Sequence, residues 1–268
     1  MEKITRPIGV FDSGVGGLTV VKSLLDKMPR ESFIYFGDTA NLPYGNKSEE
    51  QLFSYARNII SFLIQREVKA IIIACGTHSS VTLPVISGDY SLPLLGVVKA
   101  GARTAARVSR TGKIGVIATQ ATVSKLAYTG EVKSINPDYE IYEKACPRFV
   151  PLVEAGNLDG RETREAVAEY LEPLLRLGID TLILGCTHYP FLAPLIQEFA
   201  GRNVTLVDPS CETITELQGI LGRDGLLNKS DETGGREFYV SGNDESFYKV
   251  GKLLIGDTIQ AVHKLALG

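Results

Sequence analysis

Short apolar segments alternate with longer amphipathic ones along the chain, and this alternation restricts the fold more than any other feature of the sequence. The short segments are rich in Ile, Val, Leu and Phe, which is typical of strands buried on both faces of a parallel sheet. They span Ile8–Phe11, Phe33–Phe36, Ala70–Ala74, Leu94–Val97, Ile114–Ala118, Thr181–Leu184 and Val204–Val207. Amphipathic segments lie between them, so the pattern predicts an α/β protein with mostly parallel sheets.

Two of the amphipathic segments, residues 48–66 and 161–177, are long enough to predict extended helices. The second has one apolar stripe, which consists of Ala166, Val167, Tyr170, Leu171, Leu174 and Leu175. Pro173 lies within this stripe, and proline lacks the N–H group that a helix interior needs. We therefore expect the helix to be interrupted at Pro173.

Two short sequences occur twice and indicate an internal repeat. Ile8–Val10 reads Ile-Gly-Val, as does Ile114–Val116, 106 residues later. The segment Ile71–His78 is echoed by Leu182–His188, whose cysteine lies 111 residues after the first. The repeat predicts two similar α/β domains, related by a pseudo-two-fold axis, whose strand ends face a central cleft where a ligand would bind. The expected domains are residues 1–98 with 209–268, and residues 99–208.

The composition restricts the class of partner. The 268 residues carry a formal net charge of −3, without the basic surplus that nucleic-acid binding requires. No apolar run approaches the ~20 residues of a membrane-spanning helix, and no apolar signal core precedes the first predicted strand. We expect a cytoplasmic protein that acts on a small molecule, without a nucleic-acid or membrane partner. The sequence does not define the oligomeric state, and a homodimer is one option.

Two of the four cysteines stand at equivalent places in the repeat. Cys75 and Cys186 each follow a predicted buried strand and precede a helical segment, whose N-terminus would stabilise a thiolate. A single buried cysteine is usually a small apolar residue, but the recurrence with Thr and His close behind favours a reactive pair. Cys146 and Cys211 lack this context, and we interpret them as structural.

Two thiols that face each other across a cleft can invert a carbon centre. One thiolate removes a proton from one face of Cα, and the opposing thiol returns a proton to the other face. Cysteine suits this exchange because its ordinary pKa of about 8.5 lies close enough to neutrality to be adjusted by its surroundings. The predicted pair therefore indicates a racemase that needs no cofactor.

The glycine-rich loop after the first strand could instead bind a phosphate or a dinucleotide. Gly14 and Gly16 fit the first two positions of the G-x-G-x-x-G fingerprint, but Thr19 occupies the third. Asp12 would also place a carboxylate where the pyrophosphate should lie. We therefore disfavour a dinucleotide, and we interpret Asp12 either as a capping residue or as a group that assists a thiol or binds an ammonium group.

The remaining polar candidates are weaker. His188 follows Cys186 by two residues and could polarise that thiol. Residues 41–45 form a predicted turn after the second strand and could contact substrate. Glu154 and Asp38 are interpreted as solvated acids. No group of His, Cys and acidic residues has the spacing of a metal site, so no metal is expected.

At these positions the sequence resembles the glutamate racemases, of the aspartate/glutamate racemase superfamily. The matching motifs, which follow the family's order and spacing, are Phe11–Val20, Asp38–Gly45, Ala74–Thr77 and Gly185–Pro190. The resemblance implies a cleft between two α/β domains, no pyridoxal phosphate and no metal. It also implies interconversion of L- and D-glutamate, the D-enantiomer being used for peptidoglycan synthesis.

The resemblance also assigns roles to individual residues. It makes Cys75 and Cys186 the paired acid and base, with Asp12 and His188 assisting them. Its implied substrate-binding residues are Asp12, Ser13, Tyr44, Gly45, Gly76, Thr77, Thr187 and His188. The chain departs from the family at Gly76, where the family usually carries Asn. Gly76 retains only a backbone N–H, and we expect Gly76→Asn to lower the Michaelis constant or leave it unchanged.

Two other functions fit the same residues. One is a racemase or decarboxylase of the same fold that acts on another small acid, such as aspartate or a malonate derivative. The other is a binding protein that retains the amino-acid cleft without turnover. The presence of both cysteines weighs against the second, because loss of either thiol is the simplest route to it.

Overall fold

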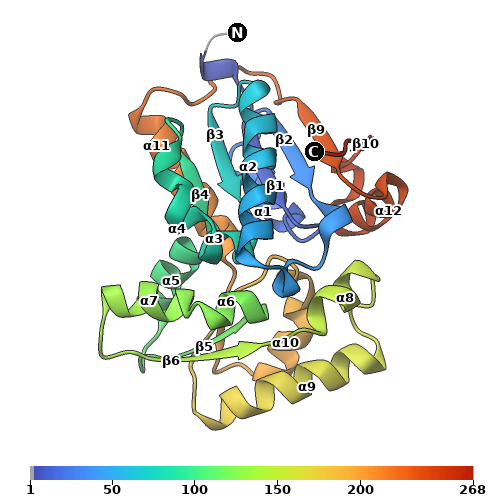
Figure 1. Ribbon diagram of the computed structural model, residues 1–268. Coiled ribbons are helices and arrows are strands. Elements are labelled where there is room, and N and C mark those ends of the chain that lie inside the picture. Colours follow the sequence, from blue (N-terminus) through green and yellow to red (C-terminus); the bar gives the residue numbers. More distant parts are fainter. Residues whose placement is uncertain (1–2, 268) are drawn as a thin grey trace.

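The computed structural model describes residues 3–267, and these form two fully parallel β-sheets, of six and four strands (Figure 1). The larger sheet contains β1 (Ile8–Asp12), β2 (Phe33–Gly37), β3 (Ala70–Ile73), β4 (Leu94–Gly96), β9 (Arg236–Val240) and β10 (His263–Lys264). The smaller contains β5 (Lys113–Ala118), β6 (Glu140–Ala145), β7 (Thr181–Leu184) and β8 (Thr205–Val207). The predicted α/β class with parallel sheets is confirmed.

The two sheets share one topology. The larger runs β10-β9-β2-β1-β3-β4, and the smaller runs β6-β5-β7-β8. Strands β2-β1-β3-β4 therefore correspond in order to β6-β5-β7-β8, with β1 matching β5 and β3 matching β7. In this order the chain reverses its direction of winding beside β1 and β5, and ligands of open α/β sheets bind at such switch points.

Helices cover both faces of each sheet. On the larger sheet, α1 (Leu18–Lys27), α11 (Pro209–Arg223) and α12 (Asp244–Ile255) pack on one face and α2 (Glu49–Gln65) on the other. On the smaller sheet, α8 (Phe149–Glu154), α9 (Arg161–Arg176) and α10 (Ala193–Ala200) cover one face, and α5 (Val97–Val108) and α7 (Ala127–Ile135) the other. The short helices α3 (Gly76–Val81), α4 (Leu83–Ile86) and α6 (Gln120–Ser124) follow β3 and β5. Burial on both faces explains why the sequence of most strands is continuously apolar.

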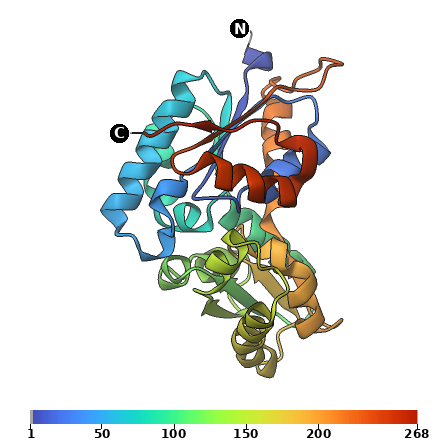
Figure 2. The same cartoon turned by 90° about the vertical axis from the view of Figure 1, so that its right-hand side faces the viewer.

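Helices α5 and α11 carry the chain between the two sheets, and they pack against each other (Figures 1 and 2). The contact is tight, since a Cβ added at Gly101 of α5 would lie 2.8 Å from Cγ of Pro209 in α11. The predicted crossing at residues 98 and 99 falls within α5, and the one at 208 and 209 falls at the start of α11. The division into domains 1–98 with 209–268 and 99–208 stays a prediction.

The expected interruption at Pro173 is wrong, because α9 is continuous from Arg161 to Arg176. Pro173 cannot donate a hydrogen bond to the carbonyl of Glu169, one turn earlier. Both residues lie on the exposed side of α9, where water can satisfy the free carbonyl. The apolar stripe packs against the smaller sheet and holds the helix together despite the missing bond.

Sequence patterning missed strands β6, β9 and β10. All three lie toward the edge of a sheet, where a strand needs fewer apolar residues. Within residues 3–267, no helix is both long enough and apolar enough to cross a membrane.

Candidate active site

A cavity of about 150 Å³ lies between the carboxyl ends of the two sheets. Cys75, at the end of β3, and Cys186, at the end of β7, both line it. Ser13, Tyr44, Gly45, Gly76, Thr77, Thr187 and His188 line it as well. The structure therefore gathers all the predicted site residues at one cavity, except that Asp12 lies just beneath its wall.

The loop after β1 is organised around the carboxylate of Asp12, which is fully buried. Its Oδ2 accepts the backbone N–H groups of Gly14 (3.2 Å) and Gly17 (2.9 Å), and its Oδ1 accepts the hydroxyl of Thr187 (3.2 Å). Burial raises the pKa of Asp12, although the nearby His188 and the two amides oppose that rise. The amides that would cradle a pyrophosphate are thus bonded to a carboxylate of the chain itself, which argues against the dinucleotide alternative.

Cys75 occupies the N-cap position of α3 and is only 5% exposed. Burial and the charge of Asp12 raise the pKa of its thiol, while hydrogen bonds from the backbone N–H groups of His78 and Thr77 lower it. The rise dominates in the absence of substrate, contrary to the expectation that the helix N-terminus would favour a thiolate here. The physical reason is that a helix of six residues offers little compensation for loss of solvent.

Cys186 belongs to a hydrogen-bonded series with His188 and Glu154. The Sγ atom lies 3.7 Å from His188 Nδ1, and His188 Nε2 lies 2.6 Å from Glu154 Oε1. Burial disfavours a charged imidazole, but the bonds to Cys186 and Glu154 outweigh it and raise the pKa of His188 well above its ordinary value. Burial likewise raises the pKa of Glu154, but His188 overrides this and lowers it. The geometry favours an imidazolium beside the sulfur of Cys186.

The interpretation of Glu154 as a solvated acid is wrong. Its side chain is only 25% exposed, and Oε1 accepts the backbone N–H of Val15 (3.2 Å) in addition to bonding His188. Glu154 therefore links the loop after β1 to the end of β7. No local sequence signal marks it, because its position at the end of α8 is set by the packing of that helix on the smaller sheet.

Asp38 is also buried rather than solvated. Its carboxylate accepts the hydroxyls of Tyr44 (2.5 Å) and Ser241 (2.6 Å) and the side-chain amide of Asn41 (3.0 Å). These bonds fix the ring of Tyr44, which stacks on Tyr55 at the cavity wall. Asp38 thus orders the turn at residues 41–45.

Thr119 and Cys146 also line the cavity, although neither was among the predicted site residues. Thr119 lies at the end of β5, and its Oγ1 is 2.9 Å from Oγ1 of Thr77. The repeat contains a signal for it, because an offset of 106 residues from Ser13 leads to Thr119. Cys146 is fully buried in the cavity wall, which is compatible with a structural role.

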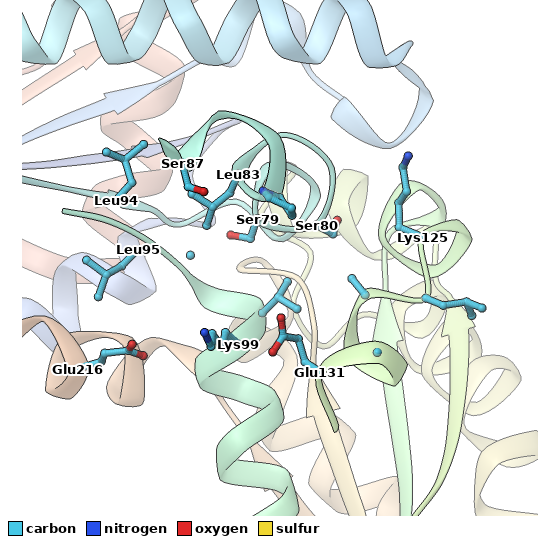
Figure 3. A pocket seen from close by; sticks show the side chains of 16 residues that line it. Ser79, Ser80, Leu83, Ser87, Leu94, Leu95, Lys99, Lys125, Glu131 and Glu216 are labelled. Atoms are coloured by element: carbon cyan, nitrogen blue, oxygen red, sulfur yellow. The ribbon is translucent and has the colours of Figure 1, made fainter. Parts of the chain in front are cut away.

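A larger cavity, of about 530 Å³, lies between α3–α4, the start of α5 and α6–α7. Figure 3 shows Lys99, Lys125, Glu131 and Glu216 around it, together with serine hydroxyls and leucines. None of the four cysteines lines it. Within residues 3–267, no cluster of three or more His, Cys, Asp or Glu side chains could hold a metal ion.

Comparison with known proteins agrees with this geometry. The family model for Asp/Glu/hydantoin racemases matches residues 19–217. A glutamate racemase of Neisseria meningitidis is 45% identical over 271 aligned residues, which cover 100% of both chains. The chain belongs to the glutamate racemases.

Solved structures agree with this family assignment. A glutamate racemase isoform of Bacillus anthracis superposes with a TM-score of 0.92 at 35% identity, over 98% of this chain and 97% of that one. The glutamate racemase of Francisella tularensis, solved in complex with D-glutamate, superposes with a TM-score of 0.91 at 37% identity. That alignment covers 98% of each chain, so the family likeness extends over both sheets.

Proposed function

We propose that the chain interconverts L- and D-glutamate by two-base proton transfer at Cα, with Cys75 and Cys186 as the opposed acid and base. The observation that carries this proposal is that the two thiols line one cavity from equivalent ends of two different sheets. A substrate between them presents one face of Cα to each sulfur. A single base would have to reach both faces.

The proton steps balance without a cofactor. In one direction the Cys186 thiolate takes the Cα proton, and the electron pair moves into the substrate's carboxylate as an enediolate. Cys75, whose thiol proton is retained because burial raises its pKa, then protonates Cα from the other face. Cys186 ends as the thiol and Cys75 as the thiolate, which is the starting state for the reverse direction.

The residues around each sulfur support this division of roles. The imidazolium of His188, held by Glu154, stabilises negative charge on Cys186. On the other side, the amides of Thr77 and His78 point at Cys75. We assign Asp12 and His188 as the assisting groups. Asp12 acts through its bond to Thr187, which lies next to Cys186.

Glutamate requires donors for two carboxylates and an acceptor for an ammonium group. The hydroxyls of Ser13 and Thr77 and the backbone amides of Gly45 and Gly76 can supply the donors. The hydroxyls of Tyr44 and Thr187 already donate to Asp38 and Asp12, so their oxygens can serve as acceptors for the ammonium group. The carboxylate of Asp12 attracts the ammonium group. The D-glutamate formed would serve peptidoglycan synthesis, as the family assignment implies.

Comparison of L-glutamate with L-aspartate as substrates tests this proposal. Purified protein, dialysed against a chelator and free of pyridoxal absorbance, is expected to racemise glutamate with the higher kcat/KM. Each enantiomer of glutamate should yield the other with deuterium from solvent at Cα. A preference for aspartate would contradict the substrate assignment, and activity that returns only with pyridoxal phosphate or a metal would contradict the mechanism.

A further inference from the structure

The two thiol-bearing segments touch through their backbones at Gly76 and Gly185. A Cβ atom added at Gly76 would lie 2.5 Å from the carbonyl oxygen of Gly185, 3.5 Å from its carbonyl carbon and 3.8 Å from Cα of Cys186. All three neighbours are backbone atoms, so rotation of a side chain cannot relieve the overlap. The contact exists only because residue 76 has no side chain.

Gly185, the other residue of this contact, is itself closely packed. A Cβ at Gly185 would lie 2.9 Å from the carbonyl oxygen of Ile117 and 2.9 Å from Cε2 of Tyr128. Tyr128 is fully buried, so Gly185 packs closely against the core of the smaller sheet on the side where its own Cβ would lie. Movement of Gly185 in that direction is therefore blocked.

This contact between Gly76 and Gly185, here called the seam, involves the residues next to the two catalytic cysteines in the sequence. Gly76 follows Cys75, and Gly185 precedes Cys186. Next to it, the hydroxyls of Thr77 and Thr119 form a second link between the two sheets, at 2.9 Å. Each catalytic cysteine is therefore bonded directly to one of the two glycines in contact.

We infer that Gly76 is a positioning residue, whose direct backbone contact with Gly185 sets the distance between the two catalytic thiols. The inference rests on the proposed two-base mechanism and adds a role for the position at which the chain departs from its family. It adds an expected loss of kcat to the prediction that Gly76→Asn lowers the Michaelis constant or leaves it unchanged. Any residue other than glycine at position 76 adds a Cβ, which would lie 2.5 Å from the carbonyl oxygen of Gly185.

Gly76→Ala and Gly76→Asn test the inference, with Gly88→Ala as the matched control. Gly88 is exposed, and a Cβ there would meet nothing within 4 Å. Relief of the overlap requires a displacement on the order of 1 Å, and misplacement of that size can lower a rate by about 100-fold. We expect both Gly76 variants to lower kcat by about 10- to 100-fold, with KM changed by less than about threefold.

The rate at which iodoacetamide alkylates Cys75 and Cys186 tests the inference independently of racemase activity. Cys75 and Cys186 are 5% and 6% exposed, so wider spacing should speed their alkylation in the Gly76 variants but not in Gly88→Ala. Native kcat together with native alkylation rates in Gly76→Ala would overturn the inference. If the natural protein failed to racemise glutamate, the proposed function would fall while the alkylation comparison would still report on the seam.

A crystal structure of the unmodified protein provides a second measurement if the Gly76 variants do not fold. The inference requires Cα of Gly76 and the carbonyl of Gly185 in direct van der Waals contact with the cavity occupied by D-glutamate. A gap there wide enough for a Cβ atom would refute it.

Discussion

Replacement of Glu154 by glutamine tests how the chain activates Cys186. Glutamine keeps the length of the side chain and can still accept a hydrogen bond from His188 Nε2, but it removes the negative charge that lies 2.6 Å away. A hydrogen bond to a charged group contributes about 1.5–3 kcal/mol. Glutamine retains a neutral hydrogen bond of about 0.5–1.5 kcal/mol, so the net loss is about 1–1.5 kcal/mol. Loss of this stabilisation in the transition state lowers kcat/KM by about 5- to 13-fold, since each 1.36 kcal/mol corresponds to tenfold.

The variant should slow one proton transfer more than the other. Glu154 contacts His188, and His188 contacts Cys186, whereas Cys75 lies at the end of the other sheet. Cys186 removes the Cα hydrogen from only one enantiomer of glutamate. For that enantiomer, we therefore expect deuteration at Cα to cause a larger primary isotope effect in Glu154→Gln than in the natural protein. Circular dichroism follows racemisation of each labelled enantiomer in turn.

A matched control separates this effect from a general loss of surface charge. Glu165 pairs with Arg161 on the exposed side of α9, far from the cavity lining, so Glu165→Gln should leave kcat/KM unchanged. A folded Glu154→Gln protein with the kcat/KM of the natural chain would refute the assigned role of Glu154.

Two further predictions concern stability. Because the pKa of Glu154 is lowered, the His188–Glu154 pair stabilises the fold fully above the ordinary glutamate pKa of about 4.3, and this stabilisation is lost at lower pH. Because the pKa of His188 is raised, the stabilisation is complete below the ordinary histidine pKa of about 6.5 and is lost as the pH rises further. In urea titrations, the difference in free energy of unfolding between the natural protein and Glu154→Gln should be largest between those pH values and should shrink on either side; a flat difference would contradict the ion pair. Lys69 and Glu31 form a buried pair at 2.5 Å, so Lys69→Met should lower the free energy of unfolding by about 3–5 kcal/mol, and adding Glu31→Leu should restore much of it. An additive loss in the double variant would show that the pair is not the cause.

The sequence predicted the central strands of each sheet because those strands are buried on both faces and are continuously apolar. It also predicted the placement of Cys75 and Cys186, since each cysteine follows such a strand and the repeat relates the two positions. Strands β6, β9 and β10 were not predicted, because β6 contains Glu140, Glu143 and Lys144 and β9 begins with Arg236 and Glu237. These charged residues interrupt the continuous apolar pattern by which the other strands were predicted.

The burial of the acidic residues at the site could be predicted from the sequence only in part. Asp12 lies within a recognisable motif, but Glu154 and Asp38 look like ordinary surface acids in sequence. Their burial depends on contacts with residues 34 and 203 positions away, His188 and Ser241. Likewise, the consequence of glycine at position 76 is invisible until the fold brings Gly185 against it.

The isotope content of the product tests the two-thiol account most directly. In deuterated water, with conversion kept low, the natural protein should form product that carries deuterium at Cα while the remaining substrate stays protonated there, because proton removal and delivery use different sulfurs. Cys75→Ser and Cys186→Ser should each abolish net racemisation, since a serine hydroxyl is a far weaker base, whereas Cys146→Ser and Cys211→Ser should behave like the natural protein. Product that retains the substrate's own Cα proton, or near-normal turnover in Cys75→Ser or Cys186→Ser, would contradict the account.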